Sequence, residues 1–351
     1  MKTKEKQFTH LLKRIASFAF PLALAGILSA CGHKRPEPAG PYEPKDYMAA
    51  SKQIGFDLSQ LDAVPNNPFP TLSVPTYITK VKENYFIVDC YHNQVIYHDN
   101  LKDPLYEWQV MTSDIAMGHT LASDGTVYLI DDTEHDRILV MEESVNNNGR
   151  PVFVPTQEFT EIGDRPHYIL YDAYTDTFYA WSSQSGEMFL FRHAPGESAM
   201  YLTEVRSIPS LKGVYVRSFT IVEDRVYFVS GNKSILEADL YSFEVLKEYP
   251  VPDALAGMIQ LTPIADYFYI TISTDSTGSQ EYATMIRTKD LSDLATGNYE
   301  DVYHNFIGGG TPYYITRIDD FWYLTEHRIP GHSIWQFQVK ENEITNVTSI
   351  Y

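Results

Sequence analysis

A repeating pattern of short apolar segments runs through residues 75–351 and constrains the fold more than any other feature. Each repeat opens with an apolar segment led by Pro, Gly or Val, and these segments begin at Pro75, Gly118, Pro166, Val216, Gly257 and Pro312. Nine to twelve residues later comes an aromatic and β-branched run, starting at Tyr85, Val127, Phe178, Val226, Phe268 and Phe321. A third apolar run then begins at Gln94, Arg137, Glu187, Ser234, Ala283 and Ser333.

Successive openings are 41 to 55 residues apart, which leaves room for a fourth strand in each unit, for example at 107–111, 201–208 and 343–350. Short strands rich in Val, Ile, Tyr, Phe and Trp, separated by turn residues, are typical of antiparallel meanders. Six such units at this period predict an all-β fold, a six-bladed β-propeller with four-stranded antiparallel blades around a central channel. A β-sandwich would not explain the repetition. We expect one propeller over residues 75–351, with the fifth blade the least regular.

The first 30 residues have the pattern of an export signal. Five basic residues and one acidic residue precede an apolar run from Ile15 to Leu28, which is too short and too interrupted for a membrane-spanning helix. The run ends in Leu28-Ser29-Ala30-Cys31-Gly32, which resembles the lipobox of bacterial lipoproteins. This resemblance implies that residues 1–30 are a signal peptide and that Cys31 is lipidated. The protein would then be anchored to a membrane through this lipid on the extracytoplasmic side of the cell envelope. The alternative is an ordinary cleaved signal with an accidental cysteine.

Residues 31–74 contain seven prolines and little periodicity, which predicts a semi-rigid tether between the lipidated cysteine and the propeller. Within it, residues 52–62 could form a short ordered cap on the domain. The second cysteine, Cys90, would have no partner for a disulfide if Cys31 is lipidated. Because it ends an apolar run, we expect Cys90 to be a small buried side chain and not a nucleophile.

Charge excludes one class of partner. The 351 residues include 27 Lys and Arg against 46 Asp and Glu, a formal net charge of −19 at pH 7. A nucleic-acid-binding surface needs a basic stripe to follow the phosphates, so we expect no nucleic-acid partner.

Blade three resembles a known repeat. Arg165-Pro-His-Tyr-Ile-Leu-Tyr-Asp, followed by Thr177-Phe-Tyr-Ala-Trp-Ser and Gly186-Glu-Met-Phe-Leu-Phe, is similar to a divergent NHL-type repeat. The resemblance implies the propeller fold and no single activity, because six-bladed relatives include scaffolds, receptors for peptides or glycans, and metal-dependent lyases and hydrolases.

Propeller geometry indicates where a functional site would lie. The first strand of each blade lines the channel, and it begins on the face where the loop between the second and third strands also ends. The residue after each repeat leader is therefore expected on this channel face; these residues are Thr76, His119, His167, Arg217, Met258 and Tyr313. The loops add further polar residues, including Glu326 and His327. Six histidines are predicted on this face, namely His92, His119, His135, His167, His327 and His332.

Two functions compete for this face. In one, His119, His167 and His327 hold a divalent metal, or a His/Glu pair that includes Glu326 moves protons, because imidazole is the usual zinc ligand. Arg217 and Tyr313 would then hold an anionic or polar group. In the other, the same six residues bind a ligand without catalysis, or simply line a wet channel.

The sequence therefore predicts a ligand-binding or protein-interaction module whose partner is a peptide, a glycan or a protein. A metal-dependent envelope lyase or hydrolase is one alternative, and a scaffold subunit of an envelope complex is the other. Four aromatic residues could stack on sugar rings or fill the wedges between blades, and these are Tyr91, Trp181, Tyr313 and Trp335. The acidic run 131–136 lacks the spacing of a calcium loop and is expected to be a solvated turn.

Overall fold

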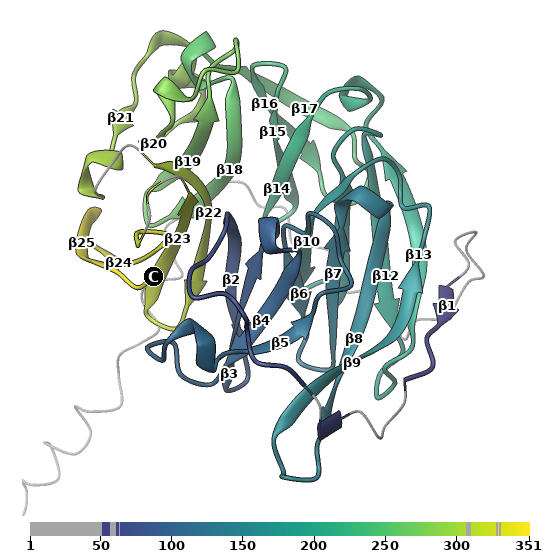
Figure 1. Ribbon diagram of the computed structural model, residues 1–351. Helices are drawn as coiled ribbons and strands as arrows, with labels where there is room; N and C mark the ends of the chain where they lie inside the picture. The colour runs from purple at the N-terminus through teal and green to yellow at the C-terminus, as the bar shows by residue number, and fades with distance from the viewer. Residues whose placement is uncertain (1–50, 57–60, 63, 307–309, 328, 330) are drawn as a thin grey trace, which may run out of the picture. The chain divides into compact units, whose positions relative to one another are not determined.

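The computed structural model describes residues 51–56, 61–62, 64–306, 310–327, 329 and 331–351. It contains six antiparallel sheets, each formed by four strands that are consecutive in the sequence, apart from one added strand in the second sheet. The sheets follow one another around the molecule as the blades of a propeller (Figure 1). The predicted six-bladed β-propeller is confirmed.

Blades one and three begin where the repeat predicts, and blade two begins three residues later. Blade one comprises β2 (Pro75–Val81), β3 (Asn84–Asp89), β4 (Gln94–His98) and β5 (Gln109–Thr112). Blade two comprises β6 (Leu121–Ser123), β7 (Val127–Asp132), β8 (Arg137–Val145) and β9 (Pro151–Phe159). Blade three comprises β10 (Pro166–Asp172), β11 (Thr177–Ser182), β12 (Glu187–His193) and β13 (Met200–Ser207).

The other three blades follow the same order. Blade four comprises β14 (Val216–Val222), β15 (Arg225–Ser230), β16 (Ser234–Asp239) and β17 (Val245–Pro250). Blade five comprises β18 (Gly257–Ile264), β19 (Tyr267–Thr274), β20 (Thr284–Thr288) and β21 (Glu300–Asp301). Blade six comprises β22 (Thr311–Ile318), β23 (Phe321–His327), β24 (Ile334–Lys340) and β25 (Glu343–Ser349). As predicted, blade five is the least regular, because its outer strand has only two residues.

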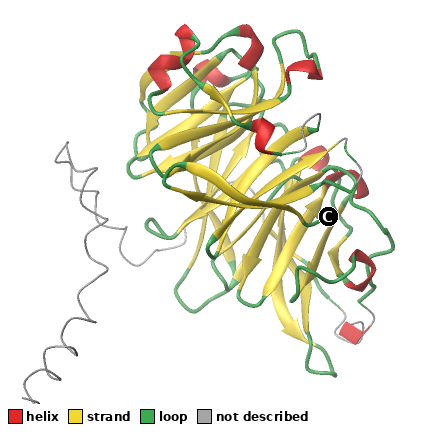
Figure 2. Ribbon diagram, turned by 90° about the vertical axis from the view of Figure 1, so that its left-hand side faces the viewer, coloured by secondary structure: helices red, strands yellow, loops and turns green. Residues whose placement is uncertain are grey.

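Helical structure among the described residues consists of short 3-10 turns at the ends of strands (Figure 2). These are η2 (Cys90–His92), η3 (Leu105–Glu107), η4 (Thr133–His135), η5 (Pro209–Leu211), η6 (Asp253–Leu255), η7 (Gln280–Tyr282), η8 (Leu291–Thr296) and η9 (Tyr303–Asn305). Over the ranges that the structure describes, none of the helices has the length and apolar character needed to cross a membrane.

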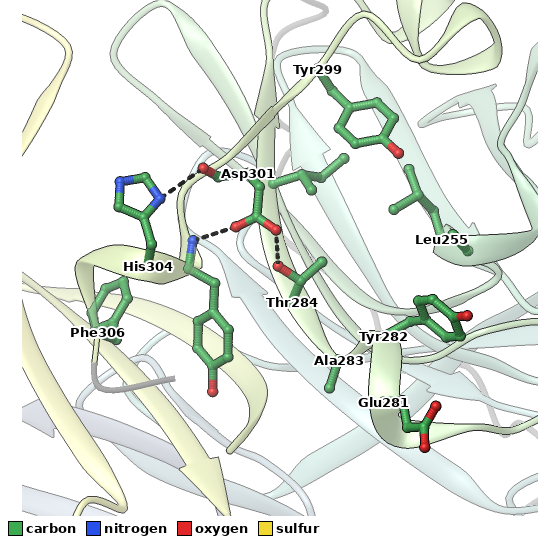
Figure 3. Close-up of a pocket in the computed structure, with 12 residues that line it drawn as sticks. Leu255, Glu281, Tyr282, Ala283, Thr284, Tyr299, Asp301, His304 and Phe306 are labelled. Carbon is green, nitrogen blue, oxygen red and sulfur yellow. Dashed lines mark hydrogen bonds between the residues drawn. The ribbon is translucent and has the colours of Figure 1, made fainter. Parts of the chain in front are cut away.

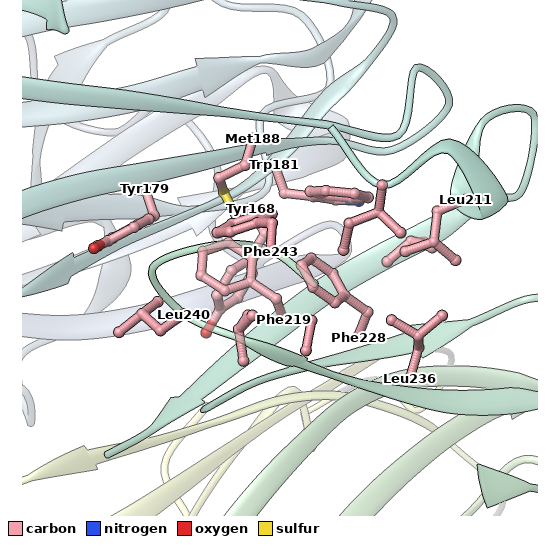
Figure 4. Close-up of a cluster of buried hydrophobic side chains, with 14 of the residues drawn as sticks. Tyr168, Tyr179, Trp181, Met188, Leu211, Phe219, Phe228, Leu236, Leu240 and Phe243 are labelled. Atoms are coloured by element: carbon pink, nitrogen blue, oxygen red, sulfur yellow. The ribbon is translucent and has the colours of Figure 1, made fainter. Parts of the chain in front are cut away.

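Both faces of a blade are buried against its neighbours, which is why the middle strands are apolar without alternation. All six residues of β11 are buried. Trp181 of this strand packs against Phe228 of blade four, with ring centroids 4.5 Å apart. Figure 4 shows the cluster that fills this wedge, in which Tyr168 and Met188 of blade three also meet Phe219 of blade four.

Hydroxyl groups on the first or second strand of one blade donate to backbone carbonyls at the inner strand of the next. The inner strand pairs with a second strand on one edge only, so its other edge leaves backbone carbonyls that need donors. Thr76 of blade one donates to the carbonyl of His119, 2.8 Å away, and Ser218 of blade four donates to that of Ile259 at 2.6 Å. Thr271 of blade five donates to the carbonyl of Tyr313 at 2.6 Å.

The ring closes between blades six and one through side chains, since no strand of one blade completes the sheet of the other. The hydroxyls of Thr325 and Thr316 donate to the carbonyls of Thr76 and Ile78, each at 2.7 Å. On the outer side, the indole of Trp108 donates to the hydroxyl of Tyr351 at 3.0 Å. These hydrogen bonds hold blade six to blade one without a strand shared between the two sheets.

The segment before blade one packs on the propeller where it is described. Strand β1 (Ser51–Gln53) pairs antiparallel with β9 and adds a fifth strand to blade two. Further along, the buried side chain of Asn67 donates to the carbonyls of Phe69 and Leu105. Residues 51–53 and Asn67, within the predicted tether 31–74, thus contact the propeller, and the tether and the cap over 52–62 stay predictions. The predicted signal peptide 1–30 and Cys31 lie outside the described residues.

We predict that Thr325→Val weakens the fold. The substitution keeps the side-chain volume but removes the donor to Thr76 and the acceptor for the backbone N–H of Tyr314, 3.1 Å away. Leaving these buried groups unpaired should lower the free energy of unfolding by about 1–3 kcal/mol, measured by urea denaturation. The exposed Thr126→Val is the matched control and should change it by less than about 0.5 kcal/mol. Equal stability of Thr325→Val and the wild type would contradict a role in ring closure.

Candidate functional site

β-bulges at the start of the inner strands aim the candidate residues at the channel mouth. Pairing between the first and second strands skips from Pro75 to Tyr77 in blade one and from Pro166 to Tyr168 in blade three. It skips from Val216 to Phe219 in blade four and from Pro312 to Ile315 in blade six. The bulged residues therefore include Thr76, His167, Arg217 and Tyr313, four of the six positions that the repeat places on the channel face. A bulge re-aims a side chain that regular pairing would turn toward the neighbouring sheet.

Of these, Thr76, Arg217 and Tyr313 line a cavity of about 220 Å³ at the channel mouth, which we call the channel-mouth cavity. Four of the predicted site residues line it, namely His119, Arg217, Tyr313 and His327. The other lining residues are Val74, Thr76, Cys90, Tyr91, Met117, Arg165, Tyr215, Ile259, Ser273, Thr274, Gln280 and Thr311. None of these described residues is acidic, although the chain as a whole carries a net charge of −19.

His167 lies beneath the cavity and does not line it. It is fully buried, and its ring stacks on that of His119 with centroids 3.7 Å apart and planes at 24°. Its Nδ1 lies 3.2 Å from the hydroxyl of Tyr314, whose own proton is donated to the carbonyl of Arg217. The ring nitrogen Nε2 of His167 has no hydrogen-bond partner among the described residues. Burial lowers the pKa of His167 well below its usual value, and the neighbouring His119 and Arg217 lower it further.

The stacked pair does not favour the predicted metal site. An imidazole nitrogen binds a metal in the plane of its ring, so two nearly parallel rings direct their lone pairs past one another. Throughout the part of the chain that the structure describes, no group of three or more His, Cys, Asp and Glu side chains could hold a metal ion. The divalent metal at His119, His167 and His327 stays a prediction that no observation here supports.

The side chains of Arg217 and Tyr313 carry hydrogen-bond donors that line the cavity and have no acceptor among the described residues. The guanidinium of Arg217 lies over the ring of Tyr215, 4.9 Å from its centroid, and has no ion pair or hydrogen bond with a described residue. The Tyr313 side chain likewise has only ring contacts, to His119, Tyr314 and His327. Burial raises the pKa of Tyr313 well above 10, so its hydroxyl stays protonated. Both groups can therefore donate to an acceptor in the cavity.

Glu326 does not belong to the site, which corrects its predicted place on the channel face. Successive residues of a strand point to opposite faces, so His327 faces the cavity while Glu326 points between blades five and six. There its Oε2 accepts a hydrogen bond from the hydroxyl of Tyr303 at 2.6 Å, and the side chain is fully buried. Burial raises the pKa of this carboxyl.

Three of the predicted channel-face histidines have structural partners elsewhere. His92 lies 2.6 Å from the carboxylate of Asp89, and His135 lies 2.9 Å from that of Asp132. His332 stacks on Trp335. Asp89 and Asp132 end the second strands of blades one and two, and each accepts a backbone N–H from the loop that enters its own blade, at 2.7 and 2.8 Å. Both carboxylates are fully buried, and so are Asp131 and Thr133, so the solvated turn predicted for 131–136 is wrong over 131–133.

The remaining predictions concern the loop aromatic residues and Cys90. Trp181, Tyr313 and Trp335 are buried, with at most 7% of each side chain exposed, whereas Tyr91 is 59% exposed. Trp181 and Trp335 therefore fill wedges, whereas Tyr313 and Tyr91 line the channel-mouth cavity. Cys90 is buried as predicted, and burial raises the pKa of its thiol, which makes it a poor nucleophile. Its sulfur lies 3.9 Å from Nε2 of His119.

Arg165 and Tyr215 were not among the predicted site residues, yet a sequence signal for them exists. Each immediately precedes a repeat leader, and so do Val74, Met117 and Thr311, which also line the cavity. The position before the leader thus contributes as much to this surface as the position after it.

Comparison with known proteins shows the fold alone. No family model and no curated protein matches the chain. Among solved structures, a protein from Bacteroides uniformis described as a "putative 6-phosphogluconolactonase" has a TM-score of 0.53 at 11% identity, covering 78% of this chain and 84% of that one. A streptogramin B lyase has a TM-score of 0.50 at 16% identity, covering 80% and 84%. The chain is thus similar to known propellers, and the resemblance of blade three to NHL-type repeats stays a prediction.

We predict that His167 makes the fold acid-sensitive. In the unfolded chain this histidine titrates near its usual pKa of about 6.5, whereas in the folded chain its pKa is well below that value. Below pH 6.5 the unfolded state therefore binds a proton that the folded state does not, and stability falls as the pH falls.

The substitution His167→Phe removes the titrating group and keeps an aromatic ring stacked on His119. Between pH 7.5 and pH 5.5 the wild type should lose about 1.4 kcal/mol more stability than the variant, by denaturant unfolding at each pH. The same pH dependence in both proteins would show that His167 titrates normally in the fold.

Proposed function

We propose that this propeller binds an anionic ligand group in its channel-mouth cavity, without catalysis. The group is a carboxylate or phosphate carried by a small molecule, a peptide or a glycan. The observation that carries the proposal is the half-buried guanidinium of Arg217 beside the hydroxyl of Tyr313, both lacking acceptors among the described residues. A cation that is half-buried without a carboxylate partner is costly, and a bound anion would offset that cost.

The charge of the surroundings supports the same ligand class. Arg165 and Arg217 are the charged residues among the described lining of the cavity, and neither Asp nor Glu joins them. Arg165 pairs with Glu134 at 2.8 Å outside the lining, so Arg217 is the better anion-binding group. In a chain with 19 more acidic than basic residues, an acid-free cavity with two arginines attracts anions that the rest of the surface repels.

We further propose that the protein acts outside the cytoplasm, anchored to a membrane through a lipid on Cys31. The support is the order of basic residues, apolar run, small residues and cysteine over residues 1–32. On this account the propeller is presented to the envelope space, where its ligand or partner protein would be found. A scaffold subunit that uses the sides of the blades is the competing function; it does not require Arg217.

We predict that Arg217→Gln abolishes most of the anion binding. The probes are inorganic phosphate, succinate and D-glucuronate, tested by thermal shift and then by isothermal titration calorimetry. At least one should bind the wild type, and loss of the charged hydrogen bonds should weaken it by about 10- to 100-fold. Tyr313→Phe should weaken it less. The matched control is the exposed Arg150→Gln, outside the cavity, which should bind as the wild type does. Absence of binding by all three anions, or equal binding by Arg217→Gln, would refute the proposed function.

We predict that Cys31→Ser releases the protein from membranes. The whole chain, expressed in a bacterial host fed an alkyne-tagged fatty acid, should carry the label and sediment with the membranes. The Cys31→Ser variant should be unlabelled, and Cys90→Ser should be labelled like the wild type because Cys90 is buried. Label on the Cys31→Ser variant, or none on the wild type, would contradict the anchor.

A further inference from the structure

A second and larger cavity lies at the outer edge of blade five. Its volume is about 700 Å³, and it opens between η6, η7 and η9. It exists because β21 has only two residues and pairs with β20 only at Ile286 and Arg287, whereas the other outer strands have four to nine residues. The missing length of the outer strand leaves side chains of the blade uncovered. We call this space the blade-five cavity.

Aromatic and acidic side chains gather in the blade-five cavity. Figure 3 shows Tyr282 and Tyr299 on the side of Leu255, with Glu281 next to Tyr282 and Asp301 facing Thr284. Tyr282 is 53% exposed, an unusual state for an aromatic ring in this protein. Among the described lining residues, the ionisable groups other than tyrosine are Glu281, Asp301 and His304, so no Lys or Arg balances the two carboxylates.

Most hydrogen-bond donors in this cavity are already engaged within the protein. The hydroxyl of Thr284 donates to Asp301 at 2.7 Å, and the hydroxyl of Tyr303 donates to Glu326 at 2.6 Å. Nδ1 of His304 lies 3.1 Å from the carbonyl of Asp301. What remains for a ligand is the Glu281 carboxylate, the second lone pairs of Asp301, and the hydroxyls and ring faces of Tyr282 and Tyr299. The tyrosines could serve a sugar or a cation, but the two carboxylates without a Lys or Arg among the described lining residues favour a cation.

We propose that the blade-five cavity binds a basic side chain, the ammonium of a lysine or the guanidinium of an arginine, presented by a peptide or protein partner. Glu281 and Asp301 supply the negative charge, and Tyr282 and Tyr299 supply aromatic faces for the cation and its aliphatic stem. The charge of this cavity is opposite to that of the channel-mouth cavity, so the two sites select different chemical groups. This proposal does not depend on anion binding at Arg217.

The test is isothermal titration of the purified protein with a tri-lysine peptide amide. The comparison peptide carries Nε-acetyl-lysine at all three positions, which keeps the length and removes the side-chain charges. The lysine peptide should bind at least tenfold more tightly than the acetylated one. Glu281→Gln and Tyr282→Leu should each weaken it about fivefold or more. Both side chains are exposed, so the fold should be unaffected, which circular dichroism checks.

The matched controls are Glu107→Gln and Tyr106→Leu. They change another exposed Tyr and Glu pair on a single 3-10 turn, η3, and should bind the lysine peptide as the wild type does. Arg217→Gln should also bind it unchanged, which separates this proposal from the channel-mouth site. Three results would overturn the proposal: no binding of the lysine peptide, an equal loss in the control variants, or binding of maltotriose that Tyr282→Leu abolishes. The second would indicate general attraction to an acidic protein, and the third a carbohydrate site.

Discussion

Side-chain hydrogen bonds between neighbouring blades hold this propeller together and also set its site. Thr76 is central to them, because its hydroxyl donates to the carbonyl of His119 while its own carbonyl accepts from Thr325. In this way one residue links blades six, one and two. The carbonyl of Tyr313 is fixed similarly by Thr271. Two residues that line the channel-mouth cavity are thus held through their backbones by neighbouring blades, and a site built in this way is rigid before any ligand arrives.

The distribution of charge suits the two cavities to different chemical groups. The chain is strongly acidic, yet the described lining of the channel mouth has arginines and no carboxylate, whereas the blade-five cavity has carboxylates and no arginine or lysine. Neither arrangement is needed for folding, since the wedges between blades are filled by apolar side chains such as those around Trp181. A binding protein that must recognise an anionic ligand and a basic partner would need both.

The sequence could predict the fold because each blade repeats the same apolar pattern, and the starts of the inner strands agree with it to within three residues. It could also place His119, Arg217 and Tyr313 at the channel mouth, because each follows a repeat leader, and His327, because it ends the second strand of blade six on the same face. It could not separate Glu326 from His327, since a shift of one residue along a strand exchanges the two faces of the sheet.

The sequence could not show two other features, the burial of His167 beneath His119 and the blade-five cavity. His167 is displaced from the cavity because the ring of His119 covers it, a contact between two blades that no single repeat shows. The blade-five cavity arises from the shortness of β21, which follows the six-residue 3-10 turn η8 (Leu291–Thr296). Irregularity of the fifth unit was visible in the sequence, but not the cavity that it creates.

The most direct test of the anion site is anomalous diffraction from crystals soaked in sodium tungstate or sodium bromide. The account predicts an anomalous peak in the channel-mouth cavity, within hydrogen-bonding distance of the Arg217 guanidinium and the Tyr313 hydroxyl, that disappears in Arg217→Gln crystals. A cavity without a peak would contradict it. So would a transition metal bound at His119 and His327 in crystals never soaked in metal, which would instead favour the metal-dependent lyase or hydrolase.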